Sequence, residues 1–283
     1  MAAPSPAAPS SSTRPPSRLF RLRAQMSPTL GRLVGLGAVA LVLLLWWVLT
    51  RGATAEARVV SPVVLPSPGE VVRAFPVLFR ERGLGPSISA TMRRVGAGFL
   101  LAVIVGVPLG IVAGAWGPVR AALTPLAVFL RNIPIAVLIP LTVFWFGIDE
   151  SQKVLFIFLA TVPFVFGDAV AAVAGVPERY VETAQTLGAS TAQVIRKVLI
   201  PLAMPEIYGS LRNLFGLAFG YIMLAELINA EHGLGYLINT SQRRGQSQDI
   251  FAILIVIGAI ALAIDWTLRF FQRGFFPWRT SAE

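Results

Sequence analysis

The sequence contains few groups that could carry out covalent chemistry. It has no cysteine and a single histidine, His232, so disulfides, thiol catalysis and histidine-rich metal sites are not expected. A nucleotide-binding P-loop needs a Gly-Lys pair followed by Ser or Thr, and neither Lys153 nor Lys197 has that setting. Gly-x-Ser-x-Gly and His-Glu-x-x-His motifs do not occur either. We therefore predict no catalytic, cofactor-binding or metal-binding residue, and a chain that is not itself an enzyme.

The polar groups that could act on a solute lie inside or beside long apolar runs. Arg131 lies midway along the run 120–147, beside Asn132 and shortly before Pro134. A proline there frees a backbone carbonyl and bends a helix, and the arginine could attract an anion. We place Arg131, Asn132, Pro134 and Glu226 on a candidate translocation path. The alternatives are a structural Arg131 paired with an acid or with helix carbonyls, and a Glu226 in a structural ion pair instead of a gate or a contact across a dimer.

Other polar and aromatic residues in these runs have simpler interpretations. Asp168 and Asp265 lie near the ends of apolar runs, where we expect them to be paired or to reach the membrane surface. Trp145 and Phe146 suit an anchor at the membrane interface better than a solute contact. His232 is expected to be a loop residue.

The overall composition indicates a membrane protein. Of the residues, 55% are hydrophobic and only 13% are charged, against about 25% charged in a typical soluble domain. The net charge of +10 comes from basic residues between and beside apolar runs, as in membrane loops. We therefore expect contact with membrane lipid and no nucleic-acid partner.

The apolar runs predict an all-α integral membrane fold with about six transmembrane helices. Backbone polar groups in lipid must be paired within the segment, and the alternating pattern of about ten residues that a lipid-facing barrel needs is missing. All runs but the slightly short first one reach the roughly 20 residues that cross a bilayer. The predicted spans are 33–50, 87–115, 120–147, 152–174, 205–229 and 250–270.

The first run is interpreted as a retained helix. It is longer than the apolar region of a signal peptide, the alternative, and no Ala-x-Ala site directly follows it. Residues 1–25 are rich in Ala, Pro, Ser and Arg and are predicted to be a disordered cytoplasmic tail, followed by the first transmembrane helix and the start of a periplasmic loop at 26–64. Five arginines between 14 and 32 and three between 269 and 279 indicate that both termini are cytoplasmic, although the loop after the first span is also basic.

The segment 65–86 is predicted to contain a periplasmic amphipathic helix on the membrane surface. Ser67 and Glu70 have the spacing of a capping box, with Pro68 at the first helical position. Pro76 is expected to kink or end this helix. The alternative is an irregular loop.

The loop 177–201 between the fourth and fifth runs predicts two short helices. Pro177 suits a first helical position, and Gly188 suits the left-handed cap of the first helix. Ser190 with Gln193 forms a second capping box, and Pro201 is expected to stop the second helix. Two amphipathic helices that protrude from a membrane domain are suited to docking, with an ordinary connector as the alternative.

This loop resembles the cytoplasmic loop of binding-protein-dependent transport permeases, which reads Glu-Ala-Ala, then Gly, then Ile-x-Leu-Pro. Glu182, Ala184, Gly188 and Pro201 match, whereas Thr183, Val198 and Ile200 are conservative departures. Further motifs between 65 and 278 resemble the nitrate/sulfonate/taurine/bicarbonate branch of that family. They are Leu65-Pro66-Ser67-Pro68, Gly106-Val107-Pro108-Leu109-Gly110, Ile133-Pro134, Ile139-Pro140-Leu141, Trp145-Phe146-Gly147, Ala225-Glu226 and Gly233-Leu234-Gly235-Tyr236.

The resemblance implies a type I ABC importer permease fold in a bacterial inner membrane, with a core domain at 87–274 and a cytoplasmic tail at 275–283. It implies a second permease copy, two cytoplasmic ATPase subunits that carry ATP and Mg, and an extracytoplasmic solute-binding protein. Arg131 favours a small anionic solute such as a sulfonate, taurine or nitrate, and the missing motifs predict no cofactor in this chain. The ATPase-coupling residues would be Glu182, Thr183, Ala184, Leu187, Gly188, Ala189 and Ser190. The rival interpretation is a secondary transporter driven by an ion gradient, although no inverted repeat is visible to hold its ion ligands.

Overall fold

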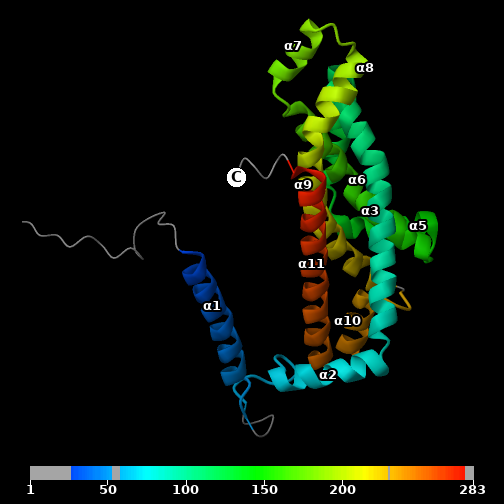
Figure 1. Ribbon diagram of the computed structural model, residues 1–283. Coiled ribbons are helices and arrows are strands. Elements are labelled where there is room, and N and C mark those ends of the chain that lie inside the picture. Colours follow the sequence, from blue (N-terminus) through cyan, green and yellow to red (C-terminus); the bar gives the residue numbers. More distant parts are fainter. Residues whose placement is uncertain (1–26, 53–57, 229, 278–283) are drawn as a thin grey trace, which may run out of the picture.

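The computed structural model describes residues 27–52, 58–228 and 230–277, and every regular element among them is helical. Figure 1 shows long helices in one body, a helix across one end of it, a short helical pair that protrudes at the other end, and a first helix that stands apart. The helices are α1 (Pro28–Leu49), α2 (Pro68–Arg80), α3 (Leu84–Ala115), α4 (Gly117–Asn132), α5 (Ile135–Phe146), α6 (Glu150–Ala174), α7 (Glu178–Thr186), α8 (Thr191–Val194), a π-helix (Ile195–Leu199), α9 (Ile200–Glu226), α10 (Leu234–Arg243) and α11 (Ser247–Phe275).

The all-α membrane fold predicted from the sequence is confirmed, but the spans differ from the prediction. Within the described ranges, α1, α3, α6 and α11 are long and apolar enough to cross a membrane singly. α4 and α5 pass that test only together, which gives up to five spans instead of six. α9 is long enough at 27 residues but is not among them, because polar residues such as Arg212 interrupt it.

The predicted span 120–147 is broken, so the prediction of one continuous helix there was wrong. α4 and α5 meet at an angle of 101°. Ile133 and Pro134 between them have ψ angles of 125° and 122°, well outside the helical region. The pyrrolidine ring disfavours a helical conformation for the residue before it, so the bend expected at Pro134 becomes a complete break.

The centre of the body is the close pairing of α3 with α6. A stripe of glycines on α3 faces α6, as is typical of membrane helices whose backbones approach closely. At Gly98, any side-chain carbon would lie only 2.5 Å from the carbonyl oxygen of Val154 on α6. The stripe consists of Gly98, Gly106, Gly110 and Gly114.

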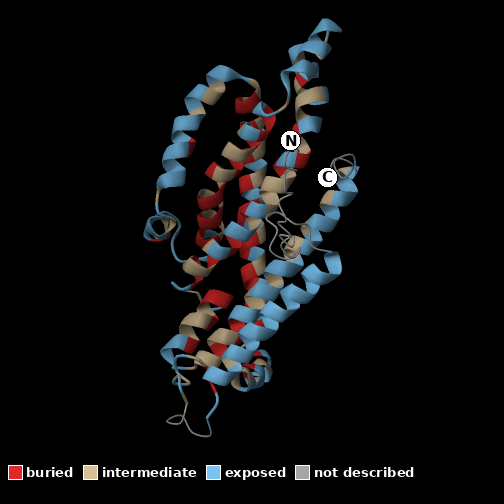
Figure 2. Ribbon diagram, turned by 90° about the vertical axis from the view of Figure 1, so that its left-hand side faces the viewer, coloured by how far each residue is buried: buried red, intermediate tan, exposed pale blue. Residues whose placement is uncertain are grey.

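Buried apolar side chains fill the space between the helices, and apolar side chains also cover the outside. Phe156, Ile222 and Ile253, from α6, α9 and α11, are fully buried in one cluster. Figure 2 shows the buried positions between the long helices and exposed positions on their outward faces. Large apolar residues such as Leu262 are exposed on α11. An apolar outer surface of this kind suits a bilayer instead of water.

α1 touches the rest of the described chain only near its C-terminal end. None of its residues from Pro28 to Leu49 is buried. The Trp46 indole N–H donates to the carbonyl of Pro66 at 2.8 Å, and its ring stacks on Phe251. The predicted tail at 1–25 and the end of the predicted tail at 275–283 lie outside the described residues, so the domain division stays a prediction.

α2 lies across one end of the long helices (Figure 1). The predicted capping box is present, because Ser67 accepts from the Glu70 amide and Glu70 accepts from the Ser67 amide. Pro76 does not end the helix, which continues to Arg80. Pro76 has no amide N–H, so the backbone carbonyl of Val72, four residues earlier, has no hydrogen-bond donor within the helix. Pro76 is exposed, so this carbonyl lies on the outward side of α2.

Candidate translocation and coupling sites

A cavity of about 330 Å³ opens where α4 breaks from α5. Arg131, Asn132 and Pro134 line it, together with Tyr221 of α9. Three of the four residues predicted for a translocation path therefore lie together, and Glu226 does not line this cavity. The break places polar backbone and a cation inside a segment whose surroundings are apolar, which is the arrangement that membrane proteins tolerate around a cavity.

The Arg131 side chain lies against one face of α6. Its Nη2 is 3.3 Å from Asp168 Oδ1, and its guanidinium lies 4.7 Å from the centre of the Phe164 ring. Gly167 leaves room for the guanidinium, because a side-chain carbon at this position would lie only 2.6 Å from Arg131 Nη1. Arg131 is thus at the end of α4 and not midway along a span, and the pair with an acid that we considered as an alternative is present. About a third of the side chain remains exposed to the cavity side.

The Asn132 side chain forms a hydrogen bond within the last turn of α4. Its side-chain amide donates to the carbonyl of Val128 at 2.7 Å. Such a bond occupies one of the carbonyls that a helix end leaves without a partner. Arg131 is therefore the one charged side chain among the described residues that line the cavity, and Asp168 beside the cavity is its partner.

Glu226 lies fully buried at the end of α9 in a network that the sequence did not reveal. Thr91 donates to it at 2.8 Å, Arg94 Nη1 at 2.7 Å and the Gly235 amide at 3.0 Å. Gly233 approaches the carboxylate so closely that any side-chain carbon there would overlap with it. This geometry is that of a structural ion pair that ties α3 and α10 to the end of α9.

Arg94 is the centre of that network and joins a second carboxylate. It also donates to Glu150 at the start of α6 and to the carbonyl of His232 at 2.7 Å. Sequence reasoning missed Thr91, Arg94 and Glu150. Arg94 itself could have indicated the network, because an arginine at the beginning of an apolar run requires a partner. Two acids, Glu150 and Glu226, lie at the ends of other apolar runs.

The remaining predicted polar residues have partners or surface positions. Asp265 pairs with Arg212 at 3.3 Å and with Arg269 at 2.8 Å. Trp145 and Phe146 are exposed at the end of α5, and His232 lies in the loop before α10. The pairing expected for Asp265 and the loop position expected for His232 are confirmed, and the interface anchor at Trp145 and Phe146 stays a prediction.

The loop 177–201 protrudes from the long helices at the end opposite to α2 (Figure 1). Gly188 has a φ of +81°, the left-handed conformation expected for it, and the capping box of Ser190 with Gln193 is present. Leu187 at the tip is 83% exposed. Of the predicted coupling residues only Ala184 and Ala189 are half-buried, and Glu182, Thr183, Leu187, Gly188 and Ser190 are exposed.

The second half of this loop differs from the prediction. Pro177 is the cap before α7 instead of its first residue, and Pro201 does not stop the second helix. The chain continues from α8 through the π-helix Ile195–Leu199 into α9, so the predicted span start at Pro205 was also wrong. In a π-helix the amides bond one residue further back, as Ile200 does to Ile195, and this wider turn accommodates the missing amide of Pro201.

Comparison with known proteins gives one consistent family. Residues 106–280 match the family described as "Binding-protein-dependent transport system inner membrane component". The taurine transport system permease protein TauC of Escherichia coli is 34% identical over 88% of this chain and 91% of its own length. The putative aliphatic sulfonates transport permease SsuC of Bacillus subtilis is 31% identical over 89% and 90%, and the nitrate import permease NrtB of Synechocystis is 29% identical over 83% and 86%.

Solved structures agree on the fold. An inward-facing structure of the MetNI methionine ABC transporter matches with a TM-score of 0.64 and 18% identity, over 70% of this chain and 97% of the other. An amino acid ABC transporter structure matches with a TM-score of 0.54 and 20% identity, over 72% and 94%.

Proposed function

The chain belongs to the family of binding-protein-dependent transport system inner membrane components, in the branch of the nitrate, sulfonate and taurine permeases, and on that premise we propose its role in detail. It is the membrane permease subunit of an ATP-driven importer for a small anionic solute. Two copies form a translocation path, two cytoplasmic ATPase subunits bind to them, and an extracytoplasmic binding protein delivers the solute. The relatives TauC, SsuC and NrtB are named as permease proteins for taurine, aliphatic sulfonates and nitrate.

The observation that carries this proposal is the protruding loop. α7 and α8 extend beyond the long helices, and between them Leu187 exposes a large apolar side chain at a tip that the rigid Gly188 turn holds in place. An exposed apolar tip on a short helical pair fits a groove on a partner, in the way that amphipathic helices dock. In this proposal the partner is the ATPase, and the loop transmits its closure to the spans through the continuous α8–α9 helix.

The cavity at the α4–α5 break supplies the path in this proposal. Arg131 gives it a positive group, which favours a solute with an oxyanion. The relatives are named for taurine, aliphatic sulfonates and nitrate, each of which carries such a group. We therefore infer a sulfonate, taurine, nitrate or similar solute.

The arrangement of the ends supports the orientation that we propose. The N-terminal end of α1, the C-terminal end of α11 and the α7–α8 loop all lie toward one side in Figure 1, and α2 lies at the other. If the ATPase binds the loop, both ends of the described chain are cytoplasmic and α2 faces the side from which the binding protein delivers solute.

Co-purification with the ATPase encoded for the same importer tests the proposal. A tagged chain should retain the ATPase, and Leu187→Ser should reduce that retention without loss of the chain from the membrane. Val72→Ser is the matched control, because Val72 is likewise an exposed apolar residue but lies on α2 at the opposite end.

Two outcomes would contradict the proposal. Retention of the ATPase by Leu187→Ser at the level of the Val72→Ser control would remove the role of the loop. Solute uptake by the chain in vesicles that contain no ATPase would favour a secondary transporter driven by an ion gradient.

A further inference from the structure

The outward face of α9 carries a polar side chain where a helix that faces lipid would be apolar. α9 has 27 residues, enough to cross a membrane, and Asn213 lies at its middle, halfway from Ile200 to Glu226. Asn213 is exposed, whereas the next residue, Leu214, is buried in the main core cluster. The amide therefore points away from the packed body of the chain, halfway along a helix of membrane-spanning length.

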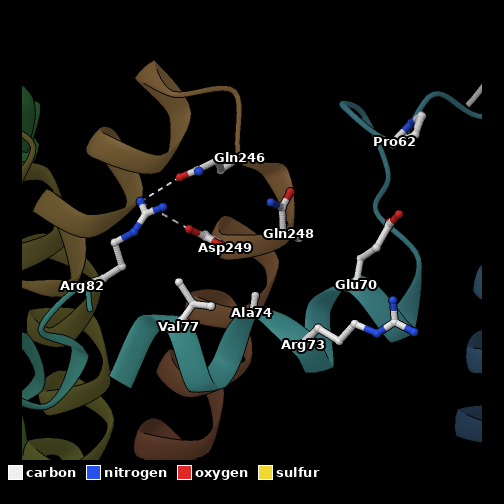
Figure 3. A pocket seen from close by; sticks show the side chains of 9 residues that line it. All are labelled: Pro62, Glu70, Arg73, Ala74, Val77, Arg82, Gln246, Gln248 and Asp249. Carbon is white, nitrogen blue, oxygen red and sulfur yellow. Dashed lines mark hydrogen bonds and ion pairs between the residues drawn. The ribbon is translucent and has the colours of Figure 1, made fainter. Parts of the chain in front are cut away.

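The Asn213 side chain forms no hydrogen bond with any described residue. Polar side chains elsewhere on the helices have partners. Thr267, which is also exposed, donates to the carbonyl four residues earlier in α11 at 2.7 Å. At the α2 end, Arg82 donates to Gln246 at 2.7 Å and pairs with Asp249 at 3.6 Å (Figure 3). An unpaired amide in hydrocarbon is costly, so Asn213 requires a partner from outside the described chain.

Asn213 belongs to an exposed face of α9 that leaves room beside it. Between residues 202 and 220 the exposed positions recur at intervals of three, four and seven residues, which places them on one side of the helix. They are Leu202, Glu206, Asn213, Gly216, Leu217 and Gly220. A side-chain carbon at Gly216 or Gly220 would meet nothing within 4 Å, in contrast to the glycines of α3 that face α6. Among the described residues, therefore, nothing covers the face at these two glycines.

This face begins at the cavity between α4 and α5. Tyr221, which directly follows Gly220, lines that cavity together with Arg131. Asn213 lies two turns of α9 before Tyr221, about 12 Å along the helix axis toward the end that carries the α7–α8 loop. A solute that leaves the cavity along this face toward the loop end therefore passes Asn213.

We propose that Asn213 contacts the solute on the translocation path and donates an amide N–H to its oxyanion after the solute has left Arg131. The role rests on the proposed transport function, and the two residues act in sequence and not on one bound solute. The amide carries no charge, so it replaces part of the hydration of an anion without holding it as an arginine does. Glu206 lies about 10 Å further along the same face, so its carboxylate is beyond hydrogen-bonding distance of an anion at Asn213.

Two other surroundings are possible for this face, and each predicts a different reactivity at position 213. Lipid tails would surround the side chain with hydrocarbon and exclude water. A helix of a second copy would pack closely on Gly216 and Gly220, as small residues in membrane helices permit. Only the path brings water and solute to Asn213.

The chain contains no cysteine, so a single introduced cysteine gives an unambiguous signal. Asn213→Cys is assembled into the complete transporter in nanodiscs and treated with sulfonatoethyl methanethiosulfonate, a water-soluble alkyl sulfonate that reacts with thiolates, and the mass of the chain reports the modification. Leu262→Cys is the matched control, because Leu262 is 73% exposed near the middle of α11. The Asn213→Cys variant should react at least about tenfold faster, since a thiolate forms in water and not in hydrocarbon.

Ser210→Cys is a second variant on the same side of α9, one turn closer to the loop. Ser210 is half-buried, and the change is nearly isosteric. It should also react faster than Leu262→Cys, and it keeps the test decisive if the Asn213→Cys variant does not assemble.

Uptake shows whether the amide acts on the solute. Proteoliposomes that contain the complete transporter and its binding protein are supplied with taurine, ethanesulfonate or nitrate. Asn213→Leu should lower uptake about tenfold or more, because it removes one hydrogen bond to a charged group, while assembly and ATP hydrolysis are retained. Thr267→Val, an equivalent polar-to-apolar change on the exposed face of α11, should have no effect.

The proposed role of Asn213 is refuted if Asn213→Cys and Ser210→Cys react no faster than Leu262→Cys, which would place the face in lipid. It is also refuted if oxidation joins two Asn213→Cys chains that the sulfonate reagent does not modify, which would place the face between two copies. Undiminished uptake by Asn213→Leu would refute it as well. Coupled ATP hydrolysis and uptake in any of these cases would leave the proposed transport function intact, whereas failure of the original chain to retain the ATPase would contradict that function itself.

Discussion

Replacing Arg94 with methionine should destabilise the chain much more than replacing its partner Glu226 with glutamine. The reason is an asymmetry in the network. Glu226 is fully buried, and Arg94 is the only cation that touches it among the described residues. Arg94 also holds Glu150 and the carbonyl of His232, so it keeps partners when Glu226 is neutralised.

The magnitudes follow from that asymmetry. Arg94→Met leaves a buried carboxylate with only the Thr91 hydroxyl and the Gly235 amide, and loss of one member of a buried pair costs about 3–5 kcal/mol. Glu226→Gln keeps the shape but replaces one acceptor oxygen with an NH2 donor, so a hydrogen bond such as that from the Gly235 amide is lost, which costs about 1.5–3 kcal/mol. The double variant should cost less than the sum of the two, because the second change removes the charge that the first left unpaired.

The assay is reversible unfolding of the purified chain in mixed micelles, with the free energy of unfolding compared across both single variants and the double variant. Arg93→Met is the matched control, because Arg93 is the preceding residue on α3 but is exposed and forms no ion pair within the described ranges. Its change should stay within about 0.5 kcal/mol.

Equal and small losses for Arg94→Met and Glu226→Gln would refute the reasoning, because they would mean that Glu226 carries no charge that Arg94 has to balance. A Glu226→Gln variant of full stability but without uptake would instead return Glu226 to the translocation path.

Three further changes test other parts of the molecule. Gly188→Val should strain its left-handed turn by about 1–2 kcal/mol and uncouple ATP hydrolysis from uptake while the spans still insert, and full uptake by this variant would contradict the role of the loop. Arg131→Gln should abolish uptake but cost under about 1 kcal/mol of stability, since its pair with Asp168 is about one-third exposed; a loss of uptake only in proportion to lost protein would refute a solute contact. The two hydrogen bonds from Arg58 hold the pKa of Glu70 down to about 2 from an ordinary 4.5, so this pair should stabilise α2 fully above pH 4.5 and lose that contribution as the pH falls toward 2. Because Glu70 is itself one-third exposed, the loss should be under about 1 kcal/mol, and melting curves at pH 6 and 3 should show Glu70→Gln to be less sensitive to pH than the original chain.

Features set by neighbouring residues were predictable from the sequence. The capping box of Ser67 with Glu70 and the left-handed turn at Gly188 depend on contacts within three or four residues, and both are present. The long apolar runs likewise gave the positions of α3, α6 and α11 to within a few residues.

Features set by distant contacts were not predictable. Arg94 and Glu226 lie 132 residues apart, so no pattern of neighbouring residues predicts that they are in contact. From the local sequence, Pro201 cannot be distinguished from a proline that ends a helix. The helix continues through it because a π-helix directly precedes it. The break at Pro134 was expected as a bend, but its angle of 101° depends on what packs against each half.

The glycine stripe between α3 and α6 limits how this sequence can diverge. At Gly98 the obstacle to any side chain is the backbone oxygen of Val154, which no substitution on α6 can remove. At Gly106 the nearest atom is instead Val165 Cγ1 at 2.8 Å, which alanine at 165 would remove, while Val165 Cβ at 3.0 Å and the Phe166 amide nitrogen at 3.2 Å would remain tight. An alanine at 106 would therefore need a smaller residue at 165 and a shift of a few tenths of an ångström, whereas an alanine at 98 would require the two helices to separate further.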